Sequence, residues 1–267
     1  MAKLASIPET ELLDLLEKGI PTERIAALYR IPESTLLRQL AAMEREKQRQ
    51  EALMEARMRS AMGGRPFPSD ELMEIPGSFA AGTELLNWVR ATFLSEDGPL
   101  YNPDHDHLAY ASLALLWTSA PYKKHGRLVA GLAEMPSVQG NAWVRARIDR
   151  QLIEWFGEVP TFLITLSAPI AAALDDANFC SLVEHELYHC GQAVDEFGSP
   201  KFNAETGMPN LAIKGHDVEE HLGVVRRYGT GAAAAGVAEL VAAASRSPSV
   251  AMASISQACG TCLRSSL

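Results

Sequence analysis

Apolar residues recur at helical spacing through the first part of the chain and are interrupted by residues that end helices. A leucine stripe over 12–16 stops at Gly19, Thr22 caps the next apolar segment, and Pro32 opens a third. This pattern predicts three short helices within 8–42. Their apolar faces would form the core of a small all-α unit.

A charged segment follows this predicted unit. Residues 44–59 are dense in Glu, Arg, Lys and Gln, and pairs such as Glu55 and Arg59 favour an exposed helix. Apolar positions are too sparse there to define the heptads of a coiled coil. Gly and Pro residues over 63–69 then form the clearest break in the chain.

Beyond the break, the hydrophobic pattern changes between helical and strand periods. Residues 84–94, a segment from about 102 to 119, and residues 143–156 have helical spacing. Residues 127–134 and 161–167 predict strands. This order of elements indicates an α+β architecture. We predict a helical unit with its charged arm over 1–62, a linker over 63–78, a main domain over 79–247 and a C-terminal tail over 248–267.

The run over 25–40 resembles the helix-turn-helix pattern of resolvase-like and repressor-like proteins. In those proteins the second helix of the pair enters the major groove of DNA and reads base edges with its first polar residues. Small three-helix units also serve as protein-docking modules, and Arg38 is the only cation of the presumed reading helix, so both roles stay open. The resemblance assigns DNA contact to Ser34, Thr35, Arg38 and Gln39.

The composition fits a globular protein, since 47% of the residues are apolar and 21% are charged. A formal net charge of −9 argues against sequence-blind coating of nucleic acid, which depends on Lys and Arg at phosphates. Charges within residues 1–18 interrupt any signal-like apolar core, and the apolar stretch over 232–244 is too short to span a bilayer. We therefore expect a cytoplasmic protein with no membrane contact.

Two further pairs of residues, one of cysteines and one of histidines, have side chains that can bind metal. For both pairs we expect an ordinary structural role. Cys259 and Cys262 supply two ligands where a structural zinc needs four, so we interpret them as part of the C-terminal tail. His105 and His107 lie at the start of a predicted helix, where capping is the more common role.

The strongest chemical signal is the His-Glu-x-x-His sequence at His185, Glu186 and His189. Asp175 and Asp176 are suitable helix N-caps, and the apolar residues that follow have helical spacing. On a helix, two histidines four residues apart project from one face and can bind a single zinc ion. Glu186, adjacent to His185, is displaced from it by about 100° around the helix and can act as general base toward a water on the metal.

A catalytic zinc normally has three protein ligands, so the sequence must supply a third. His216 is the first choice, because it precedes a predicted helix that Asp217 caps and that would hold it rigidly. Glu219 and Glu220 are rivals, although acidic residues in a first helical turn also favour the helix dipole. His221 is interpreted as a packing residue.

The sequences His-Glu-Leu-Tyr-His, Asp-Glu-Phe-Gly over 195–198 and Gly-His-Asp-Val-Glu-Glu over 215–220 resemble the phage metallopeptidase family. A more distant likeness is to SprT-like zincins, in which Gly-His before a helix supplies the third ligand. The resemblance implies a minigluzincin-like fold, a Zn²⁺ cofactor, a protein or peptide substrate, and an origin in a phage or prophage. It assigns the metal to His185, His189 and His216 and the base to Glu186.

Our first hypothesis is a zinc peptidase that its N-terminal helices deliver to DNA or to a DNA-bound protein. The alternative is a DNA- or protein-binding regulator whose zinc site is structural or catalytically degenerate. Glu186 favours chemistry, because a purely structural site needs the two histidines but not the base.

Overall fold

The computed structural model divides into two compact units, Met1–Ala56 and Arg57–Leu267. The segment over 63–78, which the sequence predicts to be a linker, falls within the second unit. The structure describes residues 7–62, 64–124, 126–137, 139–216, 218, 235–251, 253 and 258–260.

The first unit is built from helices that meet around a small apolar core. Leu12, Ile25 and Leu36 come from successive helices, and each side chain is fully buried. Arg30 forms the turn before the third helix with a φ of 52°, a conformation that residues other than Gly adopt at a cost. The helices are α1 (Glu9–Glu17), α2 (Thr22–Leu28) and α3 (Glu33–Met62).

The third predicted helix and the charged helix predicted over 44–59 are one continuous helix, α3. Neither Gly nor Pro occurs between Glu33 and Met62, so nothing in the sequence interrupts the backbone hydrogen bonds.

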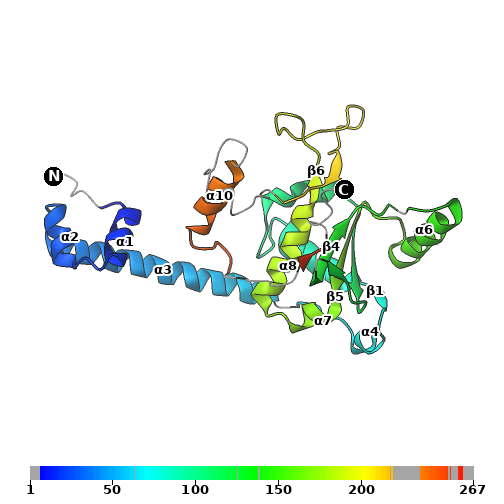
Figure 1. Ribbon diagram of the computed structural model, residues 1–267, viewed down its shortest axis with the longest axis horizontal. Helices are drawn as coiled ribbons and strands as arrows, with labels where there is room; N and C mark the ends of the chain where they lie inside the picture. The colour runs from blue at the N-terminus through cyan, green and yellow to red at the C-terminus, as the bar shows by residue number, and fades with distance from the viewer. Residues whose placement is uncertain are drawn as a thin grey trace. The chain divides into compact units, whose positions relative to one another are not determined.

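The second unit contains a mixed sheet in the order β1-β2-β5-β4-β3, with β8 also paired to β4 (Figure 1). The pairs β2–β5 and β4–β8 are parallel, whereas β1–β2, β4–β5 and β3–β4 are antiparallel. A separate antiparallel pair joins β6 to β7. The strands are β1 (Phe79–Ala81), β2 (Leu113–Thr118), β3 (Lys123–Lys124), β4 (Arg127–Glu134), β5 (Phe162–Ser167), β6 (Cys190–Gln192), β7 (Leu211–Ile213) and β8 (Ala258–Cys259).

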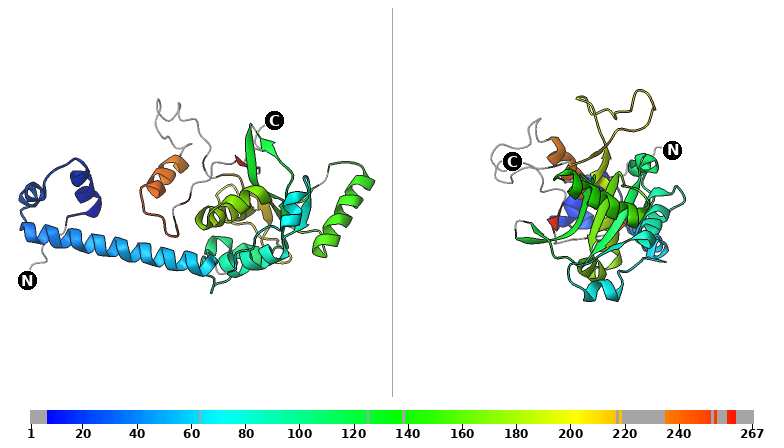
Figure 2. Two further views of the ribbon diagram at one scale, coloured as in Figure 1. Left: turned by 90° about the horizontal axis from the view of Figure 1, so that it is seen from below. Right: turned by 90° about the vertical axis from the view of Figure 1, so that its right-hand side faces the viewer.

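Helices cover both faces of this sheet, with α8 and α6 on opposite sides (Figures 1 and 2). The alternation of side chains along β2 shows the division. Leu113, Leu115 and Trp117 pack in the core that contains α8, and Ala114 and Leu116 pack against α6. The helical segments are α4 (Asp70–Glu74), α5 (Thr83–Val89), a π-helical turn (Arg90–Leu94), a 3-10 helix (Pro103–Tyr110), α6 (Ala142–Phe156), α7 (Ala168–Ala173), α8 (Asp176–His189) and α10 (Ala235–Ala244).

The prediction of one helix over about 102–119 is wrong. Its first part is the 3-10 helix over Pro103–Tyr110, and its second part is the central strand β2. All six residues of β2 are buried, because the strand is covered on both faces. A strand of this kind has no alternation of polar and apolar residues, and its sequence is hard to tell from a buried helix.

The other predicted elements of this unit are present at 84–94, 127–134, 143–156 and 161–167. The α+β class is therefore confirmed. Within the described part of the chain, no helix has the length and apolar character needed to cross a membrane.

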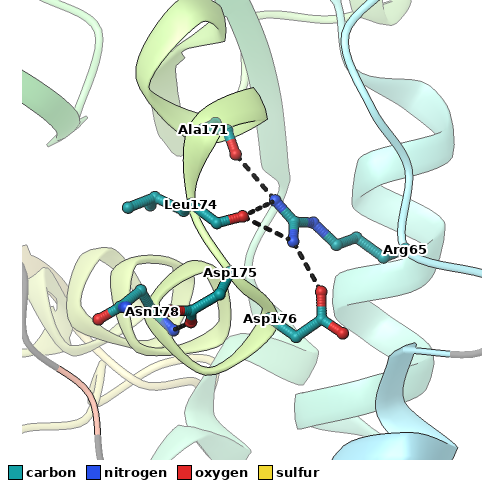
Figure 3. A network of polar contacts seen from close by, with 6 residues as sticks. All are labelled: Arg65, Ala171, Leu174, Asp175, Asp176 and Asn178. Atoms are coloured by element: carbon teal, nitrogen blue, oxygen red, sulfur yellow. Dashed lines mark hydrogen bonds and ion pairs between the residues drawn. The ribbon is translucent and has the colours of Figure 1, made fainter.

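Arg65 connects the segment before the sheet to the start of α8 (Figure 3). Its guanidinium donates hydrogen bonds to the carbonyl oxygens of Ala171 and Leu174 at 2.8 and 3.2 Å, and to Asp176 Oδ1 at 2.9 Å. The ring of Phe179 lies 4.1 Å from the guanidinium carbon. The Arg65 side chain is only 4% exposed, so the end of α7 and the beginning of α8 are held around one buried cation.

We expect Arg65→Ala to lower the free energy of unfolding by about 2–4 kcal/mol, because buried carbonyl oxygens and an aromatic face lose their cationic partner. Urea unfolding followed by circular dichroism measures the change. Asp176→Asn is the matched control and should cost less than about 1 kcal/mol, since the Asp176 side chain is 55% exposed. Equal losses in both variants would contradict this account.

Candidate metal centre

Helix α8 brings the two histidines of the motif together at its C-terminal end. The Nε2 atoms of His185 and His189 lie 3.3 Å apart. The helix begins at the N-cap Asp175, whose side chain accepts a hydrogen bond from the backbone N–H of Asn178. That bond is the main cause that lowers the pKa of Asp175. The predicted helical placement of the motif is confirmed.

Glu186 lies on the side of α8 that packs against β4 and is completely buried. A Cβ atom added to Gly131 of β4 would lie 2.5 Å from Glu186 Oε1, closer than real Cβ atoms come to other heavy atoms. A side chain at position 131 would displace this carboxylate from the position it occupies. The sheet therefore contributes to the position of Glu186, which the sequence motif alone does not show.

The hairpin between β6 and β7 returns the chain from His189 to His216. Cys190 pairs with Ile213, and the backbone N–H of Lys214 donates to the carbonyl of His189 at 2.9 Å. His216 follows two residues later, and its Nε2 lies 3.4 Å from Nε2 of His185. The helix that the sequence predicts after Asp217 lies outside the described residues. Strand pairing is thus the described feature that positions His216.

The Lys214 carbonyl also orients the ring of His189. Nδ1 of His189 lies 2.6 Å from this oxygen, which can only accept, so Nδ1 carries the proton and the Nε2 lone pair faces the other histidines. Burial and the positive charge of Lys214 lower the pKa of His189, but its hydrogen bonds with Cys259 and with the Lys214 backbone raise it, and the net shift is upward.

The three imidazoles match the dimensions of a tetrahedral metal site. Zinc–nitrogen bonds are about 2.0–2.1 Å long, so two nitrogens on one tetrahedral ion lie roughly 3.4 Å apart. The nitrogen separations in this centre are 3.3 and 3.4 Å. His185, His189 and His216 form one group that could hold a metal ion, and His185, Glu186 and Cys259 form another.

Cys259 is a residue of this centre that sequence reasoning missed. Its Sγ atom lies 3.4 Å from Nε2 of His189 and 3.9 Å from Oε2 of Glu186. The interpretation of Cys259 as part of an ordinary tail is therefore wrong. Its only sequence signal was the spacing to Cys262, and Cys262 lies outside the described residues.

The other histidine pair supports the centre from a distance. Nε2 of His107 lies 2.6 Å from the carbonyl oxygen of Cys190. His105 is buried with its ring centroid 4.6 Å from that of Tyr188. Neither belongs to a group of described residues that could hold a metal. The expected N-cap is supplied instead by Asn102, which accepts from the backbone N–H of Asp104.

The predicted DNA-contacting residues lie at the start of α3. Ser34 and Arg38 are exposed, and Arg38 Nε donates to the carbonyl of Ser34 at 3.1 Å. Thr35 is half-buried. Gln39 exchanges two hydrogen bonds with the backbone of Ile7, at 3.2 and 2.6 Å, so its amide is used within the unit. The remaining candidates, Glu219, Glu220 and His221, lie outside the described residues.

Comparison with known proteins identifies the family of this domain. The family described as "Putative phage metallopeptidase" matches residues 86–245, which is more than half of the chain and includes the three histidines and Glu186. No curated protein and no solved structure matched the chain. On the family match, this chain belongs to the phage metallopeptidase family.

Proposed function

We propose that this protein is a zinc-dependent peptidase in which His185, His189 and His216 hold the metal and Glu186 is the general base. The observation that carries the proposal is that the Nε2 atoms of His189 and His216 lie 3.3 and 3.4 Å from Nε2 of His185, beside the buried carboxylate of Glu186. Imidazole nitrogen is a preferred zinc ligand, and three such ligands are typical of catalytic sites.

Each residue has a separate task in the proposed reaction. A zinc ion with three protein ligands supplies a position where water becomes acidic enough to attack a peptide carbonyl. Glu186 accepts the proton of that water and transfers it to the leaving amine. Because Glu186 is buried between α8 and β4, its carboxylate is held in place before the substrate arrives.

The competing function is a binding protein with a structural metal site. A structural zinc usually has four protein ligands and has no use for a buried carboxylate beside them. Burying the Glu186 side chain costs free energy that only a functional or a specific structural role would offset. We therefore favour catalysis, in line with the family to which the chain belongs.

The N-terminal unit is proposed to direct the peptidase to its target. Ser34 and Arg38 are exposed at the start of α3, as a reading helix requires. Leu28 and Leu37 are also exposed, at 66% and 50%, and such leucines suit a protein surface better than a phosphate backbone. DNA and a protein partner are thus both candidates for this unit. Two kinds of peptidase provide precedents for such targeting. SprT-like enzymes act on proteins attached to DNA, and peptidases of mobile elements cleave repressors.

The metal assignment predicts about one zinc per chain in the purified protein, measured by elemental analysis. His185→Ala and His189→Ala should each weaken zinc binding by at least about 100-fold, because a direct ligand is lost. His216→Ala should weaken it more than Glu219→Ala or Glu220→Ala. Full zinc content in the His185→Ala, His189→Ala double variant would refute the site. If Glu219→Ala or Glu220→Ala weakens zinc binding more than His216→Ala does, the third ligand is a carboxylate.

The general-base assignment predicts that Glu186→Gln keeps zinc and the fold but cleaves at least about 100-fold more slowly, since the amide cannot accept the proton. Cleavage of a mixed peptide library, followed by mass spectrometry, supplies the readout without a known substrate. The comparison is made in the full chain and also in the Cys259→Ser background, because the Cys259 thiol lies beside His189.

The variant Gly131→Ala tests the role of Glu186 and leaves the Glu186 side chain itself unaltered. The added methyl collides with the Glu186 carboxylate, so cleavage should fall while zinc remains bound. Ala133→Val is the matched control, because it adds bulk two residues further along β4. If Glu186→Gln cleaves like the parent, another residue must be the base. If Ala133→Val loses as much activity as Gly131→Ala, the loss reflects overpacking of the core rather than displacement of the Glu186 carboxylate.

The targeting assignment predicts salt-sensitive binding of duplex DNA by the full chain, measured by fluorescence anisotropy. Arg38→Ala should lower the affinity about tenfold without changing zinc content, because one cationic contact is lost. Arg24→Ala, an exposed arginine on α2, is the control and should have a smaller effect. Absence of salt-sensitive binding in the full chain would leave protein docking as the role of this unit.

A further inference from the structure

The C-terminal segment of the chain reaches the metal centre as a strand. β8 pairs with β4 so that Cys259 lies opposite Gly131, the residue that makes room for Glu186. The backbone N–H of Gly260 donates to the carbonyl of Gly131 at 2.8 Å, and Nζ of Lys124 donates to the carbonyl of Gly260 at 2.9 Å. These contacts fix the backbone at Cys259 against β4 and so determine where its side chain starts.

The position of the Cys259 sulfur fits a metal ligand. Zinc–sulfur bonds are about 2.3 Å long, so a thiolate and an imidazole nitrogen on one tetrahedral zinc lie roughly 3.5 Å apart. The separation between Sγ of Cys259 and Nε2 of His189 is 3.4 Å. A ligand group of His185, Glu186 and Cys259 also lies within 4.8 Å. The sulfur thus lies at ligand distance from Nε2 of His189 and within 4.8 Å of the ligand atom of His185.

The other two described cysteines differ from Cys259 in their surroundings. Cys180 and Cys190 are buried, and burial raises the pKa of the Cys180 thiol to about 12 and that of the Cys190 thiol further still. Cys259 is only partly buried and faces imidazole and carboxylate groups rather than the apolar core. Of these three thiols, it alone has the setting of a metal ligand.

We propose that Cys259 is an intramolecular fourth ligand of the metal and keeps the peptidase latent while β8 is paired with β4. This inference rests on the proposed function. When the metal binds, the thiol releases its proton to solvent and a metal–sulfur bond forms. Four protein donors then fill the tetrahedral set, so no position is left for a water and Glu186 has no proton to accept.

The element that carries Cys259 is suited to reversible release. As far as the structure describes it, β8 is two residues long and pairs with Val129 and Gly131 of β4. It also occupies an edge of β4, where an extended peptide could otherwise add as a strand. When β8 withdraws, the sulfur takes up a proton and a water takes its place on the metal. The same movement frees the ligand position and the strand edge next to it.

Cobalt substitution tests this proposal without an activity assay. We expect full-length protein loaded with Co²⁺ to show a near-ultraviolet thiolate-to-cobalt charge-transfer band together with the strong visible bands of a tetrahedral site. Cys259→Ser should lose the ultraviolet band and keep visible cobalt bands. Cys262→Ser, the matched control three residues further along the chain, should keep the ultraviolet band and the visible bands. His185→Ala should lose the ultraviolet band and the visible bands.

The outcomes separate this proposal from the proposed function. Two results would overturn the role of Cys259 and leave the histidine site intact. One is a parent protein with visible cobalt bands but no charge-transfer band, and the other is loss of the charge-transfer band in Cys262→Ser instead of Cys259→Ser. Failure of both the parent and Cys259→Ser to bind cobalt would refute the site itself. Cleavage of the peptide library should rise at least about tenfold in Cys259→Ser, because a position for water opens.

Alkylation of the unaltered chain provides a measurement that needs no variant. Iodoacetamide should modify Cys259 at least about tenfold more slowly with zinc bound than after chelation, because a coordinated sulfur is a poor nucleophile. Peptide mass spectrometry locates the modification, and Cys262 serves as the internal reference. Equal rates at Cys259 in the two states would overturn the proposal.

Discussion

The close packing of α8 against β4 at Gly131 is the constraint on which the whole centre depends. With no side chain at this position, the helix approaches the strand closely enough for the Glu186 carboxylate to fit between them. Gly131 is also the β4 residue that pairs with Cys259 of β8. The same position of the sheet therefore borders both the Glu186 carboxylate and the strand that carries the Cys259 thiol.

Helix α8 is fixed at both ends by interactions that do not involve the metal. At its start, Asp175 caps the helix and Arg65 binds Asp176 and the preceding carbonyl oxygens. At its end, the backbone of Lys214 makes two hydrogen bonds with His189. Ligands that are positioned by the fold lose little conformational entropy when they bind an ion. The arrangement of His185 and His189 is therefore a property of the folded domain.

The parts of this protein that could be predicted from sequence are those whose geometry is local. The motif helix follows from its N-cap Asp175 and the helical spacing of the apolar residues after it, and any α-helix places His185 and His189 on one face. β2 could not be recognised because burial on both faces removes its periodicity. Cys259 and Arg65 could not be assigned, because their partners lie far away in sequence and their segments are short or rich in Gly and Pro. Each depends on a contact that only the folded chain creates.

Because β6 pairs with β7, the loop between these strands can vary in length while His189 and His216 keep their positions. Both ends of the hairpin are held where Cys190 faces Ile213, so the chain between them can change without moving His189 or His216. Doubling a flexible loop costs only about 0.6 kcal/mol of closure entropy. The hairpin of this protein carries the exposed side chains of Phe197 and Phe202 beyond the paired strands. The surface that these aromatic side chains form can therefore change while the three imidazoles keep their places.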